Sequence, residues 1–296
     1  MLTLHAGESS LVLAPEIGGA IVGWTFGTVP LLRRPHPNAI VQGSIHGLAC
    51  FPLIPFSNRI AWGKFRWDGS DHIMPRNLGD HPHTIHGVGW QSTWQVATVS
   101  ATTVVMTLRH DAAGEQARRW PFAFAAEQHF TLSRDALSVV LMLTNLHPRA
   151  APAGLGLHPY FPRADSPTLR FNAANAWLND ETMLPAKCIP VPPEWDHTAG
   201  QRIGSTPLDN CYAGWDGGAR IGWDAEGPGV VVEADDLFRH LIVYAPPGQD
   251  FFCLEPVSHM TDAINRMDAV PDHGLRTLGA GETLRGTMTF RLEGVA

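Results

Sequence analysis

Charged residues are sparse in this sequence, and no basic excess is present. Of its 296 residues 17% are charged and 44% are hydrophobic, and 21 Lys and Arg stand against 28 Asp and Glu. The formal net charge of -7 argues against nucleic acid or anionic lipid as a partner, because proteins that bind these concentrate Lys and Arg on one face. The composition predicts a globular chain with a large core rather than a disordered one.

Long apolar runs are also missing. The N-terminal segment "MLTLHAGESSLVLAPEIGG" lacks the basic region followed by a continuous apolar stretch that a signal peptide needs. No stretch approaches the length of roughly 20 apolar residues that a membrane-spanning helix requires. We therefore expect a cytoplasmic protein with no membrane partner.

Cysteine is scarce, and its spacing is irregular. Cys50, Cys188, Cys211 and Cys253 lie far apart, without a C-x-x-C pair. This pattern is unlike the disulfide framework of small secreted proteins. Free thiols in a reducing compartment fit best, although the spacing leaves a disulfide open. None of the four stands beside an evident histidine base in the sequence.

Helical periodicity is weak throughout, and alternation with a period of two replaces it. The best short helix candidate is "MTDAINRMD", residues 260–268. In "LRGTMTFRL", residues 284–292, apolar and polar positions alternate as in a half-buried strand. In "ALSVVLMLTN", residues 136–145, Val140 and Met142 make the second face apolar as well, which predicts a strand covered on both faces.

Further strand candidates are spread along the whole chain. They occupy residues 94–100, 103–110, 126–133, 229–234, 240–245 and 250–256, and turn-rich stretches such as 111–115 and 245–250 separate them. We interpret the Pro-rich residues 188–210 as one long loop, and we find no repeat, linker or shift in composition. The pattern predicts a single all-β domain over residues 1–296, built as a large antiparallel β-sandwich.

His158 is the first candidate functional residue. It follows "GLGL" and precedes Pro159, which biases it toward an extended backbone. Gly154, Gly156 and His158 would then share one face, and the two glycines would leave a hollow beside the ring for a ligand. The alternative is a core histidine bonded to a carbonyl, which is the commoner role of a lone histidine.

Glu255 is the second candidate, in the segment "FFCLEP". On a strand it shares a face with Phe251 and Cys253, and Pro256 marks where ladder pairing would end. Desolvation would raise the pKa of a carboxyl group beside aromatic rings, which suits a general base. An exposed glutamate or a salt-bridge partner is the alternative.

Two pairs of adjacent polar residues are further candidates for functional residues. Asn58 and Arg59 stand inside an apolar stretch, and the arginine fork suits adjacent sugar hydroxyls or a buried acid. Asp209 and Asn210 precede aromatic residues, so they form either an Asx-turn or an acceptor for ligand hydroxyls with Trp215 as a stacking surface.

Three histidines in "DHPHTIHGVGW" raise the question of a metal site. His81 and His83 would face one way on extended backbone and His86 the other. Without a neighbouring Cys or a carboxylate cluster, the segment does not have the ligand set of a zinc site. We expect no bound metal.

Five segments in order resemble the aldose 1-epimerase (galactose mutarotase) family. They are "SNRIAWGKF", "HTIHGVGWQ", "LGLHPYF", "LDNCYAGW" and "FCLEPVSHMTDAIN", which together span nearly the whole chain. The resemblance is to a bacterial branch of the family. It implies a β-supersandwich and a cofactor-free isomerase that interconverts the α and β anomers of a free aldose.

The resemblance also implies roles for individual residues. His158 matches the general acid of the family and Glu255 its general base, while Arg59, His86 and Asp209 match its sugar-binding positions. The partner would be a monosaccharide, and the protein a monomer or homodimer. "HGVGW" departs from the double glycine common in galactose mutarotases and from the signature of hexose-6-phosphate mutarotases, so neither galactose nor a phosphorylated sugar is indicated.

Two other functions compete with this one. A non-catalytic sugar-binding or sensory module would keep Arg59 and Asp209 without needing both His158 and Glu255. A glycoside hydrolase would need two placed carboxylates, and His158 would then have no task. The joint presence of His158 and Glu255 favours an enzyme.

Overall fold

The chain folds into antiparallel sheets with little helix. The computed structural model describes residues 1–163, 166–204, 207–224 and 227–295. Within these residues the α-helices are α1 (Ala39–Gln42) and α2 (Gly114–Arg119). Single 3₁₀ turns occupy Ile45–Gly47, Ala61–Gly63, Gly89–Gln91, Pro193–Trp195 and Ala263–Asn265.

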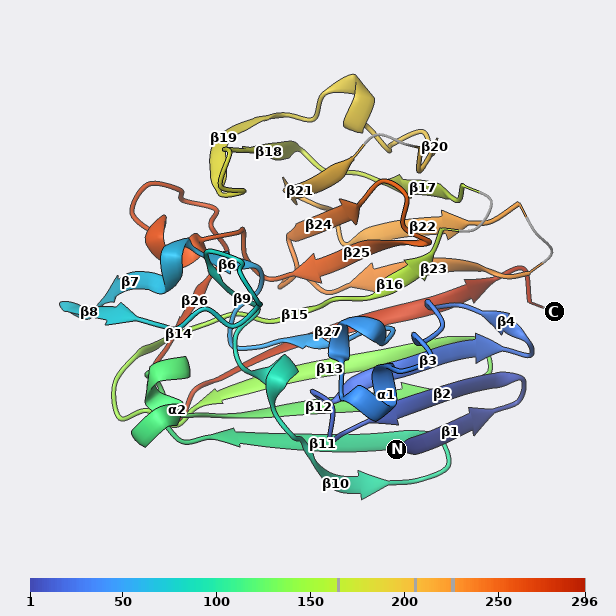
Figure 1. Ribbon diagram of the computed structural model, residues 1–296. Helices are drawn as coiled ribbons and strands as arrows, with labels where there is room; N and C mark the ends of the chain where they lie inside the picture. The colour runs from blue at the N-terminus through green and yellow to red at the C-terminus, as the bar shows by residue number, and fades with distance from the viewer. Residues whose placement is uncertain (164–165, 205–206, 225–226, 296) are drawn as a thin grey trace.

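A nine-stranded sheet forms one large layer. Its strands, in spatial order, are β10 (Gln95–Val99), β11 (Thr103–His110), β12 (Phe124–Leu132), β13 (Ala136–Asn145), β27 (Thr283–Glu293), β23 (Gly229–Ala234), β22 (Gly218–Gly222), β17 (Thr168–Phe171) and β20 (Gln201–Arg202). Figure 1 shows this sheet running from β10 at the bottom to β17 and β20 at the upper right. The C-terminal strand β27 lies in its middle, between β13 and β23.

An eight-stranded sheet forms the second large layer. Its path is β19 (Pro185–Pro190), β18 (Asn175–Asn179), β21 (Leu208–Ala213), β24 (His240–Ala245), β25 (Phe251–Val257), β15 (Gly156–Leu157) and β5 (Pro52–Leu53), and β16 (Tyr160–Pro162) also pairs with β25. β25 therefore contacts β24 on one side and both β15 and β16 on the other. His158 lies in the short gap between β15 and β16.

Smaller sheets complete the molecule. The N-terminal sheet contains β1 (Leu2–Ala6), β2 (Ser9–Ala14), β3 (Ala20–Phe26) and β4 (Val29–Pro30). Among the described residues there are also three two-stranded sheets, which pair β6 (Arg59–Ile60) with β9 (Thr84–Ile85), β7 (Lys64–Trp67) with β8 (Ser70–Ile73), and β14 (Ala151–Ala153) with β26 (Arg276–Leu278). Every ladder between these named strands is antiparallel.

The core lies where three sheets meet. Phe290 of β27 contacts Trp24 of β3 with ring centroids 6.3 Å apart, and it contacts Phe161 of β16 at 6.4 Å. Leu137 and Val139 of β13 pair with Phe290 and Met288, so their side chains occupy the same buried face. Burial of such side chains contributes roughly 1.5–3 kcal/mol each, which makes this junction a main source of stability.

The predicted all-β sandwich and its strand pattern are confirmed. Burial alternates along residues 284–292, and the strand candidates at 103–110, 229–234 and 240–245 match β11, β23 and β24. The second face of β13 is only half-buried at Val140 and Met142, so the expectation that both faces are covered was wrong. Apolar composition did not show that this face stays partly open.

Local expectations for the loops were less accurate. The 260–268 helix candidate contains one 3₁₀ turn, Ala263–Asn265. The expected turn at 111–115 leads into α2, which begins at Gly114. The long loop at 188–210 is interrupted by β20 and by a 3₁₀ turn, and it includes residues 205–206, which lie outside the described part. Within the described residues, no helix has the length and apolar character to cross a membrane.

Candidate active site

A cavity of about 750 Å³ brings the predicted site residues together. Arg59, His86, His158, Asp209 and Glu255 all line it. They come from β6, the turn after β9, the turn before β16, β21 and β25, so distant parts of the chain supply one pocket. A cavity of this size falls within the range of small-molecule sites, which is about 300–1,000 Å³.

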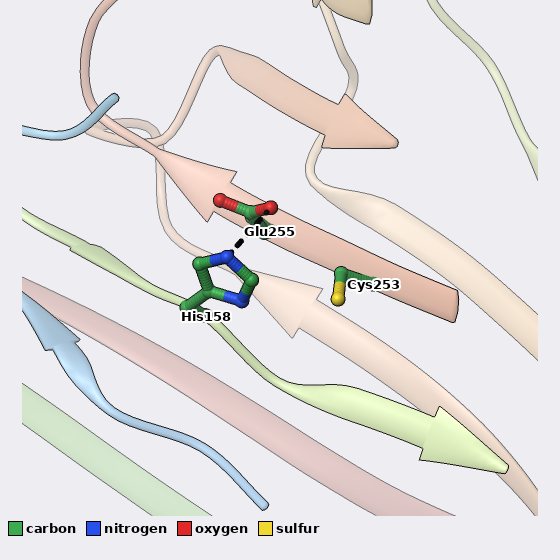
Figure 2. Close-up of side chains that lie close together, drawn as sticks. All are labelled: His158, Cys253 and Glu255. Carbon is green, nitrogen blue, oxygen red and sulfur yellow. Dashed lines mark ion pairs between the residues drawn. The ribbon is translucent and has the colours of Figure 1, made fainter. Parts of the chain in front are cut away.

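His158 and Glu255 face each other in the lining of this cavity. His158 Nε2 lies 3.4 Å from Glu255 Oε1, and the two side chains are only 9% and 3% exposed. Figure 2 shows the imidazole directed at the carboxyl group, which projects from β25. His158 Nδ1 and Glu255 Oε2 are buried without a hydrogen-bond partner among the described residues. Such unpaired polar atoms are costly, and both residues that carry them line the cavity.

Burial favours the uncharged form of both members of this pair. It lowers the pKa of His158 to about 3, helped by the nearby charges of His46 and Arg33. It raises the pKa of Glu255 well above 4.5, and the charge of Asp209 adds to this while Arg59 opposes it. Both shifts favour, for the resting pair, a protonated carboxyl group and a neutral imidazole. One internal proton transfer would convert it into a carboxylate and an imidazolium without any exchange with solvent.

An aromatic stack holds the His158 ring. Tyr160 lies parallel to it at 4.7 Å with an interplanar angle of 17°, and Phe51 covers it at 4.6 Å. The Arg33 guanidinium lies 3.9 Å from the centre of the Tyr160 ring, and its Nη2 donates to the carbonyls of His46 and Leu48. Tyr160 and Arg33 were not predicted from the sequence as site residues. Tyr160 stands two residues after His158, so alternation on extended backbone could have indicated it.

His86 is held in one tautomer. Its Nδ1 accepts a hydrogen bond of 3.0 Å from the Asn58 amide, and its own amide donates to the Asn58 carbonyl at 2.9 Å. Burial lowers the pKa of His86 well below 6.5, so the ring is neutral and carries its proton on Nε2. This N–H is a donor available at the cavity. Gly87 follows at φ +72°, where a side-chain carbon would lie 2.2 Å from the Ile54 carbonyl oxygen, so only glycine fits.

Asn58 and His86, which hydrogen-bond to each other, both have a left-handed backbone conformation. Asn58 has φ +56° and His86 has φ +62°. A residue other than glycine in this region of φ and ψ costs roughly 1–3 kcal/mol, so it persists only where the surrounding structure enforces it. Residues strained in this way are common at functional sites. The reciprocal hydrogen bonds between the two residues supply the compensating contacts.

Arg59 and Asp209 form an ion pair on the wall of the cavity. Arg59 Nη2 lies 2.9 Å from Asp209 Oδ2, and the side chains are 11% and 23% exposed. Arg59 also donates to Asn58 Oδ1 at 3.2 Å and to His81 Nε2 at 3.4 Å. The two alternatives for Arg59 thus coincide, because it pairs with an acid and lines the cavity. Asp209 belongs to β21, so the Asx-turn interpretation is wrong.

Several smaller expectations about the site were wrong. Trp215 is completely buried and offers no stacking surface. The glycines before His158 leave no hollow, because a side-chain carbon at Gly154 would lie 2.2 Å from His259, and one at Gly156 would lie 2.8 Å from Val257. They permit close packing of β25 and the following residues.

Pro256 does not end the pairing either. The ladder continues from Leu241 opposite Pro256 to His240 opposite Val257. Glu255 consequently lies inside the ladder between β24 and β25, opposite Ile242, which fixes its carboxyl group more firmly than a strand end would.

The three histidines of "DHPHTIHGVGW" are separated, but not in the expected grouping, because His81 lines the cavity with His86 and His83 does not. His83 Nδ1 accepts from the Trp62 amide and its Nε2 donates to the Thr182 carbonyl, while His81 contacts Arg59. His86 points into the cavity. Their ring nitrogens are thus engaged with different partners and do not converge on one point.

The cysteines are free thiols, and one lies in the site. Cys50, Cys188, Cys211 and Cys253 form no disulfide. Contrary to the sequence analysis, Cys253 does lie near a histidine, because its Sγ is within 4.8 Å of ligand atoms of both His158 and Glu255. β16 pairs directly with β25 at Tyr160 and Cys253, and this tertiary pairing creates the proximity.

Comparison with known proteins gives a consistent result. A family model described as aldose 1-epimerase matches residues 1–291. The Escherichia coli (strain K12) protein YphB, described as uncharacterized, is 31% identical over 300 residues, with 98% of each chain covered.

Solved structures are similar over the whole length. An Escherichia coli K12 protein provisionally named an aldose 1-epimerase has a TM-score of 0.89 at 30% identity, covering 99% of this chain and 98% of the other. A galactose mutarotase-like protein from Clostridium acetobutylicum has a TM-score of 0.89 at 20% identity, covering 99% and 95%. At 20% identity, the similarity to the Clostridium acetobutylicum protein concerns the fold alone.

Proposed function

The chain belongs to the aldose 1-epimerase family, and from this we propose that it is an isomerase that interconverts the α and β anomers of a free aldose. The observation that carries the proposal is the contact between His158 and Glu255, at 3.4 Å in a cavity that Arg59, His86 and Asp209 also line. A sugar-binding protein would not need a buried acid and base with unpaired atoms in the lining of its pocket.

Ring opening requires one proton to leave and one to arrive. The Glu255 carboxylate removes the proton of the anomeric hydroxyl, and the electron pair of that O–H bond forms the C1 carbonyl. The bond from C1 to the ring oxygen breaks as His158 protonates this oxygen, which gives the open-chain aldehyde. Rotation about the C1–C2 bond presents the other carbonyl face, and the reverse transfers close the ring.

The protonation states of the pair fit this sequence. The resting pair, with a protonated Glu255 and a neutral His158, is also the state that ring opening leaves behind. The reactive state, a carboxylate beside an imidazolium, contains the same number of protons. Hydrogen bonds from sugar hydroxyls to the unpaired Glu255 Oε2 would favour the charged form, because hydrogen bonding stabilises a carboxylate.

Arg59, His86 and Asp209 bind and orient the sugar in this proposal. Asp209 accepts from sugar hydroxyls, His86 donates through Nε2–H, and Arg59 donates from the guanidinium N–H groups that Asp209 and Asn58 leave unused. Accurate placement of the anomeric centre is itself a large part of such catalysis. The chain's own residues supply the acid and the base, so we propose that no cofactor takes part.

A polarimetric screen tests the proposal. Freshly dissolved α-aldoses are followed by optical rotation with and without the protein, and the spontaneous rate is subtracted. We expect acceleration for at least one unmodified aldose, without a phosphate requirement. Tight sugar binding with no acceleration for any aldose would instead identify a sugar-binding module and refute the enzyme.

A further inference from the structure

A third side chain joins the His158 and Glu255 pair. Cys253 stands two residues before Glu255 on β25, so both side chains project from the same face of the strand toward the His158 ring (Figure 2). One nitrogen, one sulfur and one oxygen atom from these residues all lie within 4.8 Å of one another. All three residues are buried, and Cys253 is completely so.

These atoms are poorly satisfied by the protein itself. His158 Nδ1 and Glu255 Oε2 lack hydrogen-bond partners among the described residues, although both residues are more than nine-tenths buried. The contact between the imidazole and the carboxyl group is long, at 3.4 Å. His158 and Glu255 line the large cavity, whereas Cys253 lies completely buried beside them.

We propose that Cys253, His158 and Glu255 form an inhibitory binding site for a thiophilic divalent cation such as Zn²⁺. Thiolate, imidazole and carboxylate are the three ligand types that zinc takes in proteins, with bonds of about 2.0–2.3 Å. Ligand atoms around a tetrahedral ion are then about 3.3–3.8 Å apart. The three atoms need to approach by only about 1 Å, and the cavity supplies a fourth, open position.

Charge balance favours a divalent cation at this place. Binding displaces the protons of the Cys253 thiol and the Glu255 carboxyl group, and the two resulting anions neutralise the ion in the buried site. The positive charge of Arg59 is already paired with Asp209, and the charge of Arg33 acts on Cys253 in the direction that favours its thiolate. A monovalent cation would leave a net charge buried, and magnesium prefers oxygen ligands in octahedral geometry. Sulfur therefore selects zinc, cadmium or cobalt.

Inhibition is the consequence for catalysis. A cation held by His158 and Glu255 removes the acid and the base together, and its open position lies where the anomeric centre must sit. This consequence depends on the proposed function, whereas the binding of the cation does not. The two are therefore tested separately.

Cobalt(II) tests the binding without any activity measurement. Full-length protein is treated with a chelator, exchanged into metal-free buffer and titrated with Co²⁺ while the thiolate-to-cobalt charge-transfer absorption is recorded. We expect a band that saturates at one equivalent and that Zn²⁺ abolishes. The band should persist in Cys188→Ser, since Cys188 is exposed elsewhere, and disappear in Cys253→Ser.

A second variant keeps the test independent of how Cys253→Ser folds. Glu255→Gln retains the thiol and removes one ligand, so cobalt affinity should fall at least about tenfold. The absence of a band in the wild-type protein, or an equal band in Cys253→Ser, would overturn the proposal. So would an unchanged affinity in Glu255→Gln.

The inhibition is measured in the polarimetric assay as the ratio of rates with and without Zn²⁺. We expect the wild-type rate and that of Cys188→Ser to fall with increasing Zn²⁺, and that of Cys253→Ser to be insensitive. Cobalt binding without any mutarotation would refute the proposed function and leave the metal site standing. Mutarotation that is equally zinc-sensitive in Cys253→Ser would refute the inhibitory site.

Discussion

Replacing Glu255 by Gln is the most informative single change. Gln has nearly the same shape but cannot accept a proton at neutral pH. General base assistance is typically worth about 10²–10⁴-fold, so kcat/KM should fall by at least roughly 100-fold. This corresponds to a loss of about 2.7 kcal/mol of transition-state stabilisation or more.

The same change should not destabilise the fold at neutral pH. Burial raises the pKa of Glu255 well above 4.5, so its carboxyl group keeps its proton to a higher pH in the folded protein than in the unfolded chain. Wild-type stability therefore decreases as pH rises above 4.5, up to the folded pKa. Glu255→Gln lacks this dependence and should be at least as stable as the wild type at pH 7. Loss of activity would then reflect chemistry rather than unfolding.

The pH profile of the wild-type protein adds a second test. The active pair shares one proton, so activity requires the pH to lie between uptake of a second proton and loss of the shared one. The pKa of His158, about 3, sets the acid limit, and the raised pKa of Glu255 sets the alkaline limit. The profile of kcat/KM should be flat between the pKa of His158, about 3, and the raised pKa of Glu255, for as long as the fold is intact.

Two measurements and a control variant test the assignment of Glu255 as the base. Polarimetry gives kcat/KM, urea unfolding gives the free energy of unfolding, and Glu233→Gln serves as a control because Glu233 is exposed on β23 and paired with Arg291. Retention of more than a tenth of the wild-type kcat/KM by Glu255→Gln would refute the base assignment. A steep fall of kcat/KM as the pH rises through 6.5 would show instead that His158 loses its proton as an ordinary exposed histidine does.

The remaining predictions concern binding, cofactors and packing. Arg59→Ala and Asp209→Asn should each chiefly raise KM in polarimetric kinetics. Their effects on KM should not add in the double variant, because the two side chains pair at 2.9 Å. An Asp209→Asn variant with unchanged kcat and KM would exclude Asp209 from the site. Exhaustive chelation should not lower the mutarotation rate, and a loss restored by Zn²⁺ would refute metal-free catalysis. Gly154→Ala should lower the free energy of unfolding by about 1–3 kcal/mol in urea titrations, because its methyl group would meet His259. An unchanged free energy of unfolding in this variant would contradict the packing role of Gly154.

Alternation in the sequence was enough to predict the sheets. Leu284 to Leu292 alternate as they do in β27, and the strand at 103–110 was predicted with its observed ends. This succeeds because a period of two reports directly which side chains face the core. The expectation of a single domain over residues 1–296, with a monomer or homodimer, stays a prediction.

The chemistry of the site was indicated by resemblance to a family rather than by local pattern. Read singly, His158, Glu255 and Arg59 each fitted a structural role as well as a functional one. The structure brings them to one cavity, which no local pattern shows. Their catalytic and binding roles remain proposals that the experiments above test.

The sequence by itself determined the fold class, the strands and the candidate residue types, because composition and periodicity act locally along the chain. Only the tertiary structure decided what each candidate touches. The pairing of β16 with β25 brings Cys253 beside His158, the packing of His259 occupies the space at Gly154, and the core encloses Trp215. Alternation predicts that a side chain is buried, but the segment that covers it is selected by contacts between distant parts of the chain.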